Sequence, residues 1–362
     1  MTETATARHA TGAQERVRRI LDRAVARQRG PAPLLATVRS PSLGIDVTVG
    51  DADLAFHAAS VGKLVTGALV LRLADAGALD LDAPVIEVLG AEALRGLVVV
   101  DGHDHAAEVT ARQLLGHTSG IPDAFEGRSR GSRTVAQLIV DEPDRRRSPE
   151  DVIEHSRRFQ RAVGAPGARF AYSDTGFALL GLLVEALERR PFAEVVHSRV
   201  IDPLGLRRTW MPTHSAPADA TTRLAPVLLG GTDLSRAASL SVDWAGGGIA
   251  ATPSELATIV EAVHDGRLVS APGLDAMSAT SYRFRPGLRS GLAMMRVRFG
   301  EFSPFLRSLP DATGHLGVTA AHAWRIDALD ATAVLGLGSD RAMVRSFRLL
   351  IDVVRALAAA GR

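Results

Sequence analysis

Residues 60–77 read SVGKLVTGALVLRLADAG, a short polar start followed by a mainly apolar run. From Leu64 onward the pattern predicts a helix that is buried on most faces and ends at Gly77, a suitable C-cap. Ser60 and Lys63 share one face of this helix, one turn apart, so the lysine amine can reach the serine hydroxyl. The N-terminal helix dipole favours an alkoxide and disfavours an ammonium group. The stretch therefore predicts a serine nucleophile with a lysine base.

Lysine is otherwise missing from the sequence. Among the 42 basic residues, Lys63 is the one lysine and the rest are arginine. Burial lowers the pKa of an amine until it can lose its proton, whereas a guanidinium stays charged. A requirement for a base would therefore explain the retained lysine, and chance survival explains it equally well from composition alone.

Composition excludes several classes of protein. The formal net charge of the 362 residues is only +2, which argues against nucleic-acid binding. The absence of cysteine excludes disulfides, a thiolate nucleophile and cysteine-ligated metals. Residues 1–30 contain no apolar leader segment, and the most apolar stretch, residues 177–187, is too short to span a bilayer. We expect a cytoplasmic protein without membrane or nucleic-acid partners.

Strand patterns lie at both ends of the sequence, and helical patterns lie between them. This order predicts an α/β (α+β) fold with a single catalytic domain over residues 1–362. A sheet subdomain is expected over about residues 1–78 and 245–362, and a helical subdomain over about 79–244. The expected helices cover residues 13–28, 64–77, 177–189 and 342–360, with a helix-starting capping box at 252–255. The expected strands cover residues 34–38, 45–49, 291–299, 318–326 and 331–337.

A second polar motif, FAYSDTGF at residues 170–177, follows a Pro-Gly turn. The phenol of Tyr172 can act as a proton shuttle beside a lysine, whose positive charge lowers the pKa of the phenol. The alternative is a tyrosine packed at a helix start, with Ser173 or Asp174 as the N-cap. The motif alone favours this second interpretation, although tyrosine is scarce in the sequence and Tyr282 is the only other one.

Two further motifs combine glycine with polar residues. GHLGVT at residues 314–319 enters an expected strand, where glycine marks a close approach of the backbone to a neighbour or ligand. The backbone N–H of Val318 could pair with that of Ser60 to form an oxyanion hole. GHTSG at residues 116–120 is the other motif of this kind.

Taken in order, S-x-x-K, H-T-S-G, Y-S-x after P-G, and H-x-G on a late strand resemble the serine β-lactamase and penicillin-binding-protein superfamily. The resemblance extends over about residues 55–340. It is strongest to the class C-like branch, which includes esterases, D-aminopeptidases and acyltransferases. It implies a β-lactamase/transpeptidase-like fold, in which an antiparallel sheet is flanked by helices and the site lies between the sheet and the helical region.

The resemblance also implies roles for particular residues. Ser60 would be the acylated nucleophile and Lys63 its base, with Tyr172 as the acid/base partner. The N–H groups of Ser60 and Val318 would form the oxyanion hole. The substrate-binding residues would be Asp174, His315 and Gly317.

Two positions depart from the usual pattern of the superfamily. Asp174 stands where asparagine is usual, and an ionised carboxylate can only accept hydrogen bonds. His315 stands where penicillin-recognising enzymes often have lysine, so the cationic anchor for a substrate carboxylate is missing. Both departures argue against antibiotic resistance and cell-wall cross-linking. They favour a serine hydrolase (esterase or amidase) acting on a small-molecule ester or amide. An acyltransferase of secondary metabolism and a non-catalytic ligand-binding protein of the same fold are the alternatives.

A metal site is conceivable at residues 101–105, DGHDH, through two imidazoles and a carboxylate. A solvated loop is the preferred interpretation, because nothing in the sequence indicates a closed site. We therefore expect no metal and no cofactor. The arginine-rich residues 145–161 are interleaved with acidic residues and fit a solvated helix face.

Overall fold

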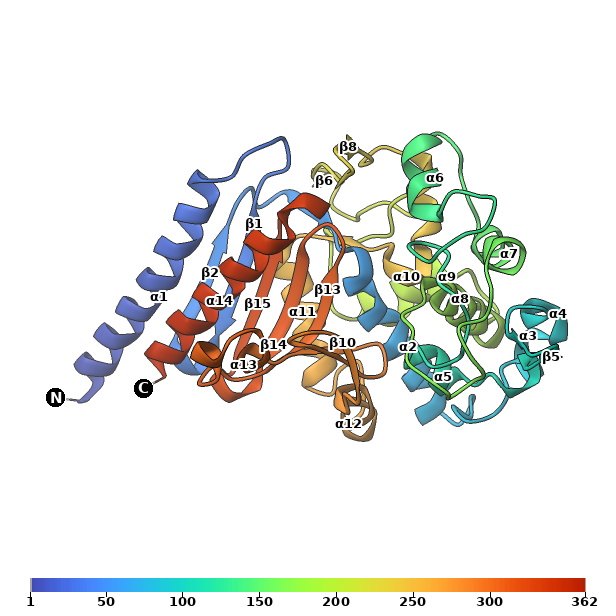
Figure 1. Ribbon diagram of the computed structural model, residues 1–362. Coiled ribbons are helices and arrows are strands. Elements are labelled where there is room, and N and C mark those ends of the chain that lie inside the picture. Colours follow the sequence, from blue (N-terminus) through green and yellow to red (C-terminus); the bar gives the residue numbers. More distant parts are fainter. Residues whose placement is uncertain (1, 362) are drawn as a thin grey trace.

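The computed structural model describes residues 2–361, and its centre is an eight-stranded antiparallel sheet (Figure 1). The strand order places the two N-terminal strands beside the last strand of the sequence, so the sheet joins both ends of the chain. Alternate residues of the central strands point to opposite faces, and both faces are buried under helices. In sheet order, the strands are β10 (Tyr282–Arg285), β11 (Leu288–Ser290), β12 (Met295–Val297), β13 (Ala312–Gly317), β14 (Ala321–Ile326), β15 (Ala331–Gly336), β1 (Leu35–Ser40) and β2 (Ile45–Val49).

The first and last helices cover one face of the sheet. α1 (Thr2–Ala26) and α14 (Met343–Ala360) pack side by side, and Figure 1 shows them across the same face. Between them and the sheet lies an apolar core that contains Trp324 and Leu350. α11 (Pro253–His264) packs on the opposite face, against β1, β14 and β15.

The remaining helices gather beside the sheet and share a second, larger apolar core. α2 and α8 pack against each other at its centre, and α2 also contacts β13. These helices are α2 (Lys63–Asp75), α3 (Ile86–Leu89), α4 (Ala91–Leu94), α5 (Ala111–Leu115), α6 (Val135–Asp141), α7 (Pro149–Phe159), α8 (Asp174–Glu188), α9 (Phe192–Val196), α10 (Trp244–Gly247) and α12 (Ala271–Ser278); α13 (Phe299–Phe302) lies beyond β12. Within residues 2–361, no helix combines the length and hydropathy that crossing a membrane requires.

Short strands complete the fold. β3 (Leu54–His57) leads into the turn before α2 and pairs with β6 (Arg223–Leu224) and β9 (Ala250–Ala251). Two small hairpins lie outside the sheets, β4 (Val99–Val100) with β5 (His103–Asp104), and β7 (Leu228–Leu229) with β8 (Thr232–Asp233). The proposed division into sheet and helical subdomains stays a prediction.

The expected antiparallel sheet flanked by helices is confirmed, and several boundaries differ. The strand expected at residues 318–326 begins later than predicted. Residues 318–320 form the turn after β13, which ends at Gly317, and β14 begins at Ala321. Ala320 makes this reversal with a φ of 57°. Val318 therefore lies in the turn rather than in a strand, and 42% of it is exposed. The strand expected at 291–299 shrinks to β12, because residues 291–294 form a turn closed by the Gly291 N–H and the Met294 carbonyl.

Three strands of the large sheet, β10, β11 and β13, lie outside the strands expected from the sequence, as do the short strands β3 to β9. β10 and β11 are joined at Pro286-Gly287, where Gly287 has a φ of 76°. A Pro-Gly pair between two short runs is the signal that would have indicated this hairpin. Of the two hydrogen bonds expected for the capping box at 252–255, only one forms. Thr252 accepts the Glu255 N–H, but the Glu255 carboxylate accepts the backbone N–H of Arg208 instead.

Candidate active site

Ser60 lies in a tight turn between β3 and α2. The chain leaves β3 at His57, forms a 3-10 turn at Ala59–Gly62, and enters α2 at Lys63. Ala59 has a φ of 48°, in the left-handed region that L-residues rarely adopt. The Ala58 N–H donates to the Ile249 carbonyl at 2.7 Å, which fixes the turn to the strand β9 region. This strained turn presents Ser60, which is half-buried, at the end of a buried helix.

Two glycines allow the helix α10 to reach the serine turn. A Cβ atom on Gly247 would lie 2.4 Å from the carbonyl carbon and oxygen of Ala59. One on Gly62 would lie 2.9 Å from the Cα of Gly247. Both distances are closer than a side chain permits, so glycine is required here for close approach. The approach brings the Gly246 carbonyl into the site.

Lys63 is the centre of the polar contacts. Its side chain is fully buried, and Nζ donates to Ser60 Oγ at 3.2 Å and to the Gly246 carbonyl at 2.5 Å. Nζ also forms an ion pair with Asp174 Oδ1. The sequence predicted that burial lowers the pKa of Lys63. Burial is the largest single cause and acts in that direction, but the Asp174 carboxylate, together with Tyr172 and Asp243, outweighs it and leaves the pKa above its usual value. In the resting protein Lys63 is therefore an ammonium group.

Asp174 is the ion-pair partner that opposes the effect of burial on the pKa of Lys63. It is the first residue of α8, and Ser173 is the N-cap, with its hydroxyl accepting the Gly176 N–H at 3.2 Å. The structure thus decides between the two candidate caps in favour of Ser173. The Asp174 carboxylate points to Lys63 and is only 13% exposed. Its position is fixed from the other side, because its N–H donates to Asp123 Oδ1 at 3.1 Å.

Tyr172 lies beside the lysine, inside a cluster of rings. Lys63 Nζ is 5.2 Å from the centre of the Tyr172 ring, which stacks on His117 at 4.2 Å and contacts Phe284 at 5.3 Å. The sequence predicts that the neighbouring cation lowers the pKa of the phenol. Burial instead raises that pKa, and the attraction of Lys63 and the hydrogen bonds to Ser60 and Lys63 do not offset it. Tyr172 is therefore a proton donor in the resting protein.

The end of β13 forms the other wall of the site. A Cβ on Gly317 would lie 2.6 Å from the Ala58 carbonyl oxygen, so this glycine permits β13 to pack on the serine turn. His315 is buried, and its Nδ1 accepts the Leu316 N–H at 2.9 Å. Burial, together with the Lys63 charge, lowers the pKa of His315 to about 3. His315 is therefore neutral and supplies no cation. Val318 is the first residue after β13, and the role of its N–H in an oxyanion hole stays a prediction.

Three further residues lie near the site and have no role predicted from the sequence. Asp243 and Asp123 are largely buried, and burial, with the nearby Asp174 charge, raises the pKa of each to about 7. For Asp243 the Lys63 charge opposes this rise. His117 stacks on Tyr172, and its Nδ1 accepts the Ser173 N–H at 3.1 Å. The HTSG motif singled out the position of His117, whereas no local pattern marks the two aspartates.

Among curated proteins, two relatives match nearly half of the chain. Penicillin-binding protein 4 of Amycolatopsis lactamdurans is 33% identical over 167 residues, 46% of this chain. Esterase EstB of Burkholderia gladioli is 37% identical over 158 residues, 43% of this chain. The aligned segment spans 38% of the length of each of these relatives.

Solved structures match along most of the chain. A D-stereospecific amidohydrolase from Streptomyces sp. is 25% identical with a TM-score of 0.73, covering 90% of this chain and 94% of that one. The D-amino acid amidase of Ochrobactrum anthropi SV3 has a TM-score of 0.79 at 21% identity, covering 97% and 100%. EstCE1, described as a hydrolase with promiscuous acyltransferase activity, has a TM-score of 0.74 at 17% identity, covering 96% and 99%. The two matches below 25% identity show the shared fold.

The match to a family model covers every residue of the candidate active site. The model of the beta-lactamase family matches residues 44–338, from the start of β2 to the residues after β15. This range includes Ser60, Lys63, Tyr172 and His315. The match extends over most of the sequence, and the chain therefore belongs to the beta-lactamase family.

Proposed function

We propose that the protein is a serine hydrolase that cleaves a small-molecule ester or amide through an acyl-enzyme on Ser60. The observation that carries the proposal is the hydrogen bond of 3.2 Å between Lys63 Nζ and Ser60 Oγ, made in a buried site in which Asp174 holds the lysine. A nucleophile, a proton acceptor and a group that orients the acceptor are the three parts that nucleophilic catalysis needs.

The Lys63–Asp174 pair supplies the base in two proton movements. A proton first passes from Lys63 Nζ to Asp174 Oδ1, which breaks an N–H bond, forms an O–H bond and leaves a neutral amine. The amine then accepts the Ser60 proton while Ser60 Oγ attacks the substrate carbonyl carbon. The first transfer runs against the raised pKa of Lys63, so the neutral pair is a minor state from which the attack on the substrate proceeds. Asp174 thus replaces the usual asparagine with a group that can store a proton.

Collapse of the tetrahedral intermediate requires a proton for the leaving group. Tyr172 lies beside both Ser60 and Lys63 and keeps its own proton, so it can donate to the leaving oxygen or nitrogen while Lys63 replaces that proton. The carbonyl oxygen becomes negative in this step, and the N–H groups of Ser60 and Val318 are the proposed donors to it. The products are the free alcohol or amine and an ester on Ser60.

The same acyl-enzyme is the intermediate of both hydrolysis and acyl transfer, the two reactions that the sequence leaves open. Water as the acceptor gives hydrolysis, and an alcohol or amine gives acyl transfer. The esterase and amidohydrolase relatives favour hydrolysis, and EstCE1 is the precedent for transfer by this fold. The intact contacts among Ser60, Lys63 and Tyr172 count against the non-catalytic alternative.

The proposed chemistry has a direct test by intact-mass spectrometry. A fluorophosphonate and an activated ester should each add one covalent group to the wild-type protein, and peptide mapping should place the group on Ser60. A serine held beside a base is activated, whereas ordinary serines do not react. The absence of an adduct with both reagents, in protein that is folded by circular dichroism, would support the ligand-binding alternative.

Asp174→Asn should change both the rate and the substrate preference. Without the carboxylate, burial acts on Lys63 with less opposition and its pKa falls, so more free amine is present at neutral pH. We expect acylation by a neutral ester or a penicillin to become several-fold faster. The preference for esters that carry an amine should weaken, because a negative group beside the scissile bond is lost.

The measurement compares acylation rates of the two proteins with a neutral ester and an aminoacyl ester. The ratio of the two rates within each protein corrects for differences in the amount of active enzyme. An unchanged ratio, together with an unchanged pH profile, would mean that Asp174 acts only through the structure of the α8 N-terminus.

A further inference from the structure

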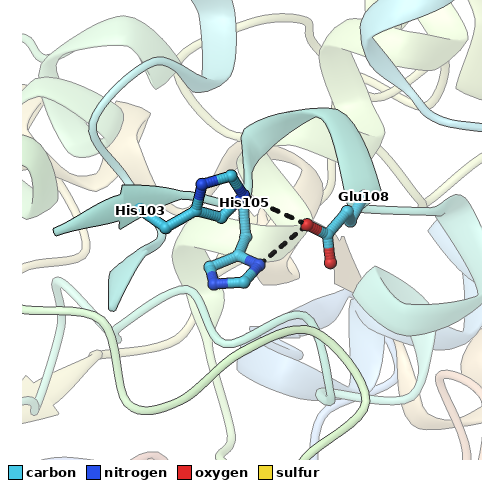
Figure 2. A group of neighbouring side chains, drawn as sticks. All are labelled: His103, His105 and Glu108. Carbon is cyan, nitrogen blue, oxygen red and sulfur yellow. Dashed lines mark hydrogen bonds and ion pairs between the residues drawn. The ribbon is translucent and has the colours of Figure 1, made fainter. Parts of the chain in front are cut away.

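Three side chains with metal-ligating atoms meet on the small hairpin β4–β5, outside the Ser60 site. His103 lies on β5, His105 follows the strand, and Glu108 ends a 3-10 turn at Ala106–Glu108. Figure 2 shows both imidazole rings turned toward one carboxylate oxygen of Glu108. His105 Nδ1 is 2.8 Å from Glu108 Oε1, and His103 Nε2 is 3.6 Å from the same atom.

The backbone holds these three side chains in place. Val99 and Val100 pair with Asp104 and His103 in the hairpin. The His105 N–H donates to the Val98 carbonyl at 2.9 Å, and the Glu108 N–H donates to the His105 carbonyl at 2.9 Å. The turn is therefore already formed, so a ligand that binds here does not have to order the chain first.

Asp104 explains why the carboxylate of this cluster is Glu108. Its Oδ2 accepts the Gly96 N–H at 2.8 Å, and its Oδ1 accepts the Ala106 N–H at 3.1 Å. Both oxygens of Asp104 are thus used to shape the turn. The sequence motif at residues 101–105 contained the two histidines of the cluster but not its carboxylate, because Glu108 is brought back to them by the 3-10 turn.

We propose that His103, His105 and Glu108 bind one late first-row divalent cation, of which Zn²⁺ is the most general example. One ligand atom from each residue lies within 4.8 Å of the others. Tetrahedral Zn²⁺ bonds of roughly 2.0–2.1 Å require ligand atoms about 3.3 Å apart. Small rotations of the exposed His103 and Glu108 side chains, which are 69% and 54% accessible, bring the three atoms to that spacing. Solvent can supply the fourth ligand.

The donor set selects the kind of metal. Two imidazole nitrogens and one carboxylate oxygen suit Zn²⁺, Ni²⁺ and Cu²⁺, whereas Mg²⁺ and Ca²⁺ prefer oxygen ligands. A bound cation would join the β4–β5 hairpin to the turn that leads into α5. Its effect is therefore on the stability of this segment, and the acylation of Ser60 needs no metal in the proposed chemistry.

The test uses the untagged full-length protein, freed of metal by a chelator. Isothermal titration should show one Zn²⁺ per chain, and Zn²⁺ should raise the melting temperature, while Mg²⁺ at the same concentration should not. Co²⁺ should give the visible absorption of a site with nitrogen ligands. His103→Ala, His105→Ala and Glu108→Gln should each weaken Zn²⁺ binding by about 10-fold or more, because each removes one of three ligands.

Glu87→Gln is the matched control, since it removes an exposed carboxylate on α3 that is not part of the cluster. It should leave Zn²⁺ affinity unchanged. Circular dichroism of the metal-free variants confirms that they are folded. The proposal is wrong if the wild-type protein binds no Zn²⁺ at millimolar concentration, if the three cluster variants bind as tightly as the control, or if Mg²⁺ stabilises the protein as much as Zn²⁺.

Discussion

Ser60→Ala should form no covalent adduct and should lower the turnover of an activated ester by on the order of 10⁴-fold or more. In the proposed mechanism the Ser60 hydroxyl supplies the atom that becomes acylated, so the variant lacks the nucleophile. The side chain is small and half-buried, so its loss removes its hydrogen bonds to Lys63 and Tyr172 and little packing. We therefore expect the melting temperature to change little.

Turnover and intact mass are measured together with thermal unfolding. Ser156→Ala is a suitable control, because it removes a buried hydroxyl that contacts Thr175 between α7 and α8, away from Ser60. This control should keep the adduct even if it is the less stable of the two proteins. Wild-type turnover by Ser60→Ala would show that Ser60 is not the nucleophile and would remove the basis of the proposed mechanism.

The sequence predicted the parts of the site that depend on local geometry. Ser60 and Lys63 are three residues apart on one helical turn, and a helix places such residues together whatever surrounds it. The run of three glycines at residues 246–248 is a local signal that the predictions did not use, since such a run can indicate a close backbone approach even before its partner, the Ala59 turn, is known.

The parts that depend on distant segments could not be predicted in the same way. The direction of the Lys63 pKa shift is set by Asp174 with Tyr172 and Asp243, and Asp174 is 111 residues away in the sequence, at the start of α8. Burial alone, which composition suggests, gives the opposite sign. Asp243 and Asp123 are also brought near Lys63 and Asp174 by packing, and neither has a local motif. Likewise, Val318 was placed in a strand because the reversal at Ala320 has no glycine or proline to mark it.

Lys63→Arg should be nearly as inactive as Lys63→Ala, with acylation lowered by about 10²- to 10⁴-fold, the range that general base catalysis contributes. Arginine keeps the positive charge that pairs with Asp174, but a guanidinium cannot accept the Ser60 proton at neutral pH. Acylation rates with an activated ester decide the question. Substantial activity of the arginine variant would mean that Lys63 acts as a positive charge and that another group is the base.

Loss of stability must be separated from loss of the base, because Lys63 is fully buried. Lys63→Ala leaves the Asp174 carboxylate without its partner, which costs about 3–5 kcal/mol of unfolding free energy for a buried pair. The double variant Lys63→Ala/Asp174→Asn removes both charges, and its melting temperature should recover most of that loss. Its acylation rate should stay as low as that of Lys63→Ala, because no base has been restored.

Thr66→Val completes the comparison on the same helix. It removes a buried hydrogen bond of 2.7 Å from the Thr66 hydroxyl to the Ala245 carbonyl, one turn beyond Lys63. This loss loosens the contact between α2 and α10 but leaves the base in place, so acylation should fall far less than in Lys63→Ala. A double variant that regained activity together with stability would show that Lys63 serves to hold the site together. A stable and inactive double variant assigns the loss to the missing amine, because at that point charge balance has been restored and only the proton acceptor is absent.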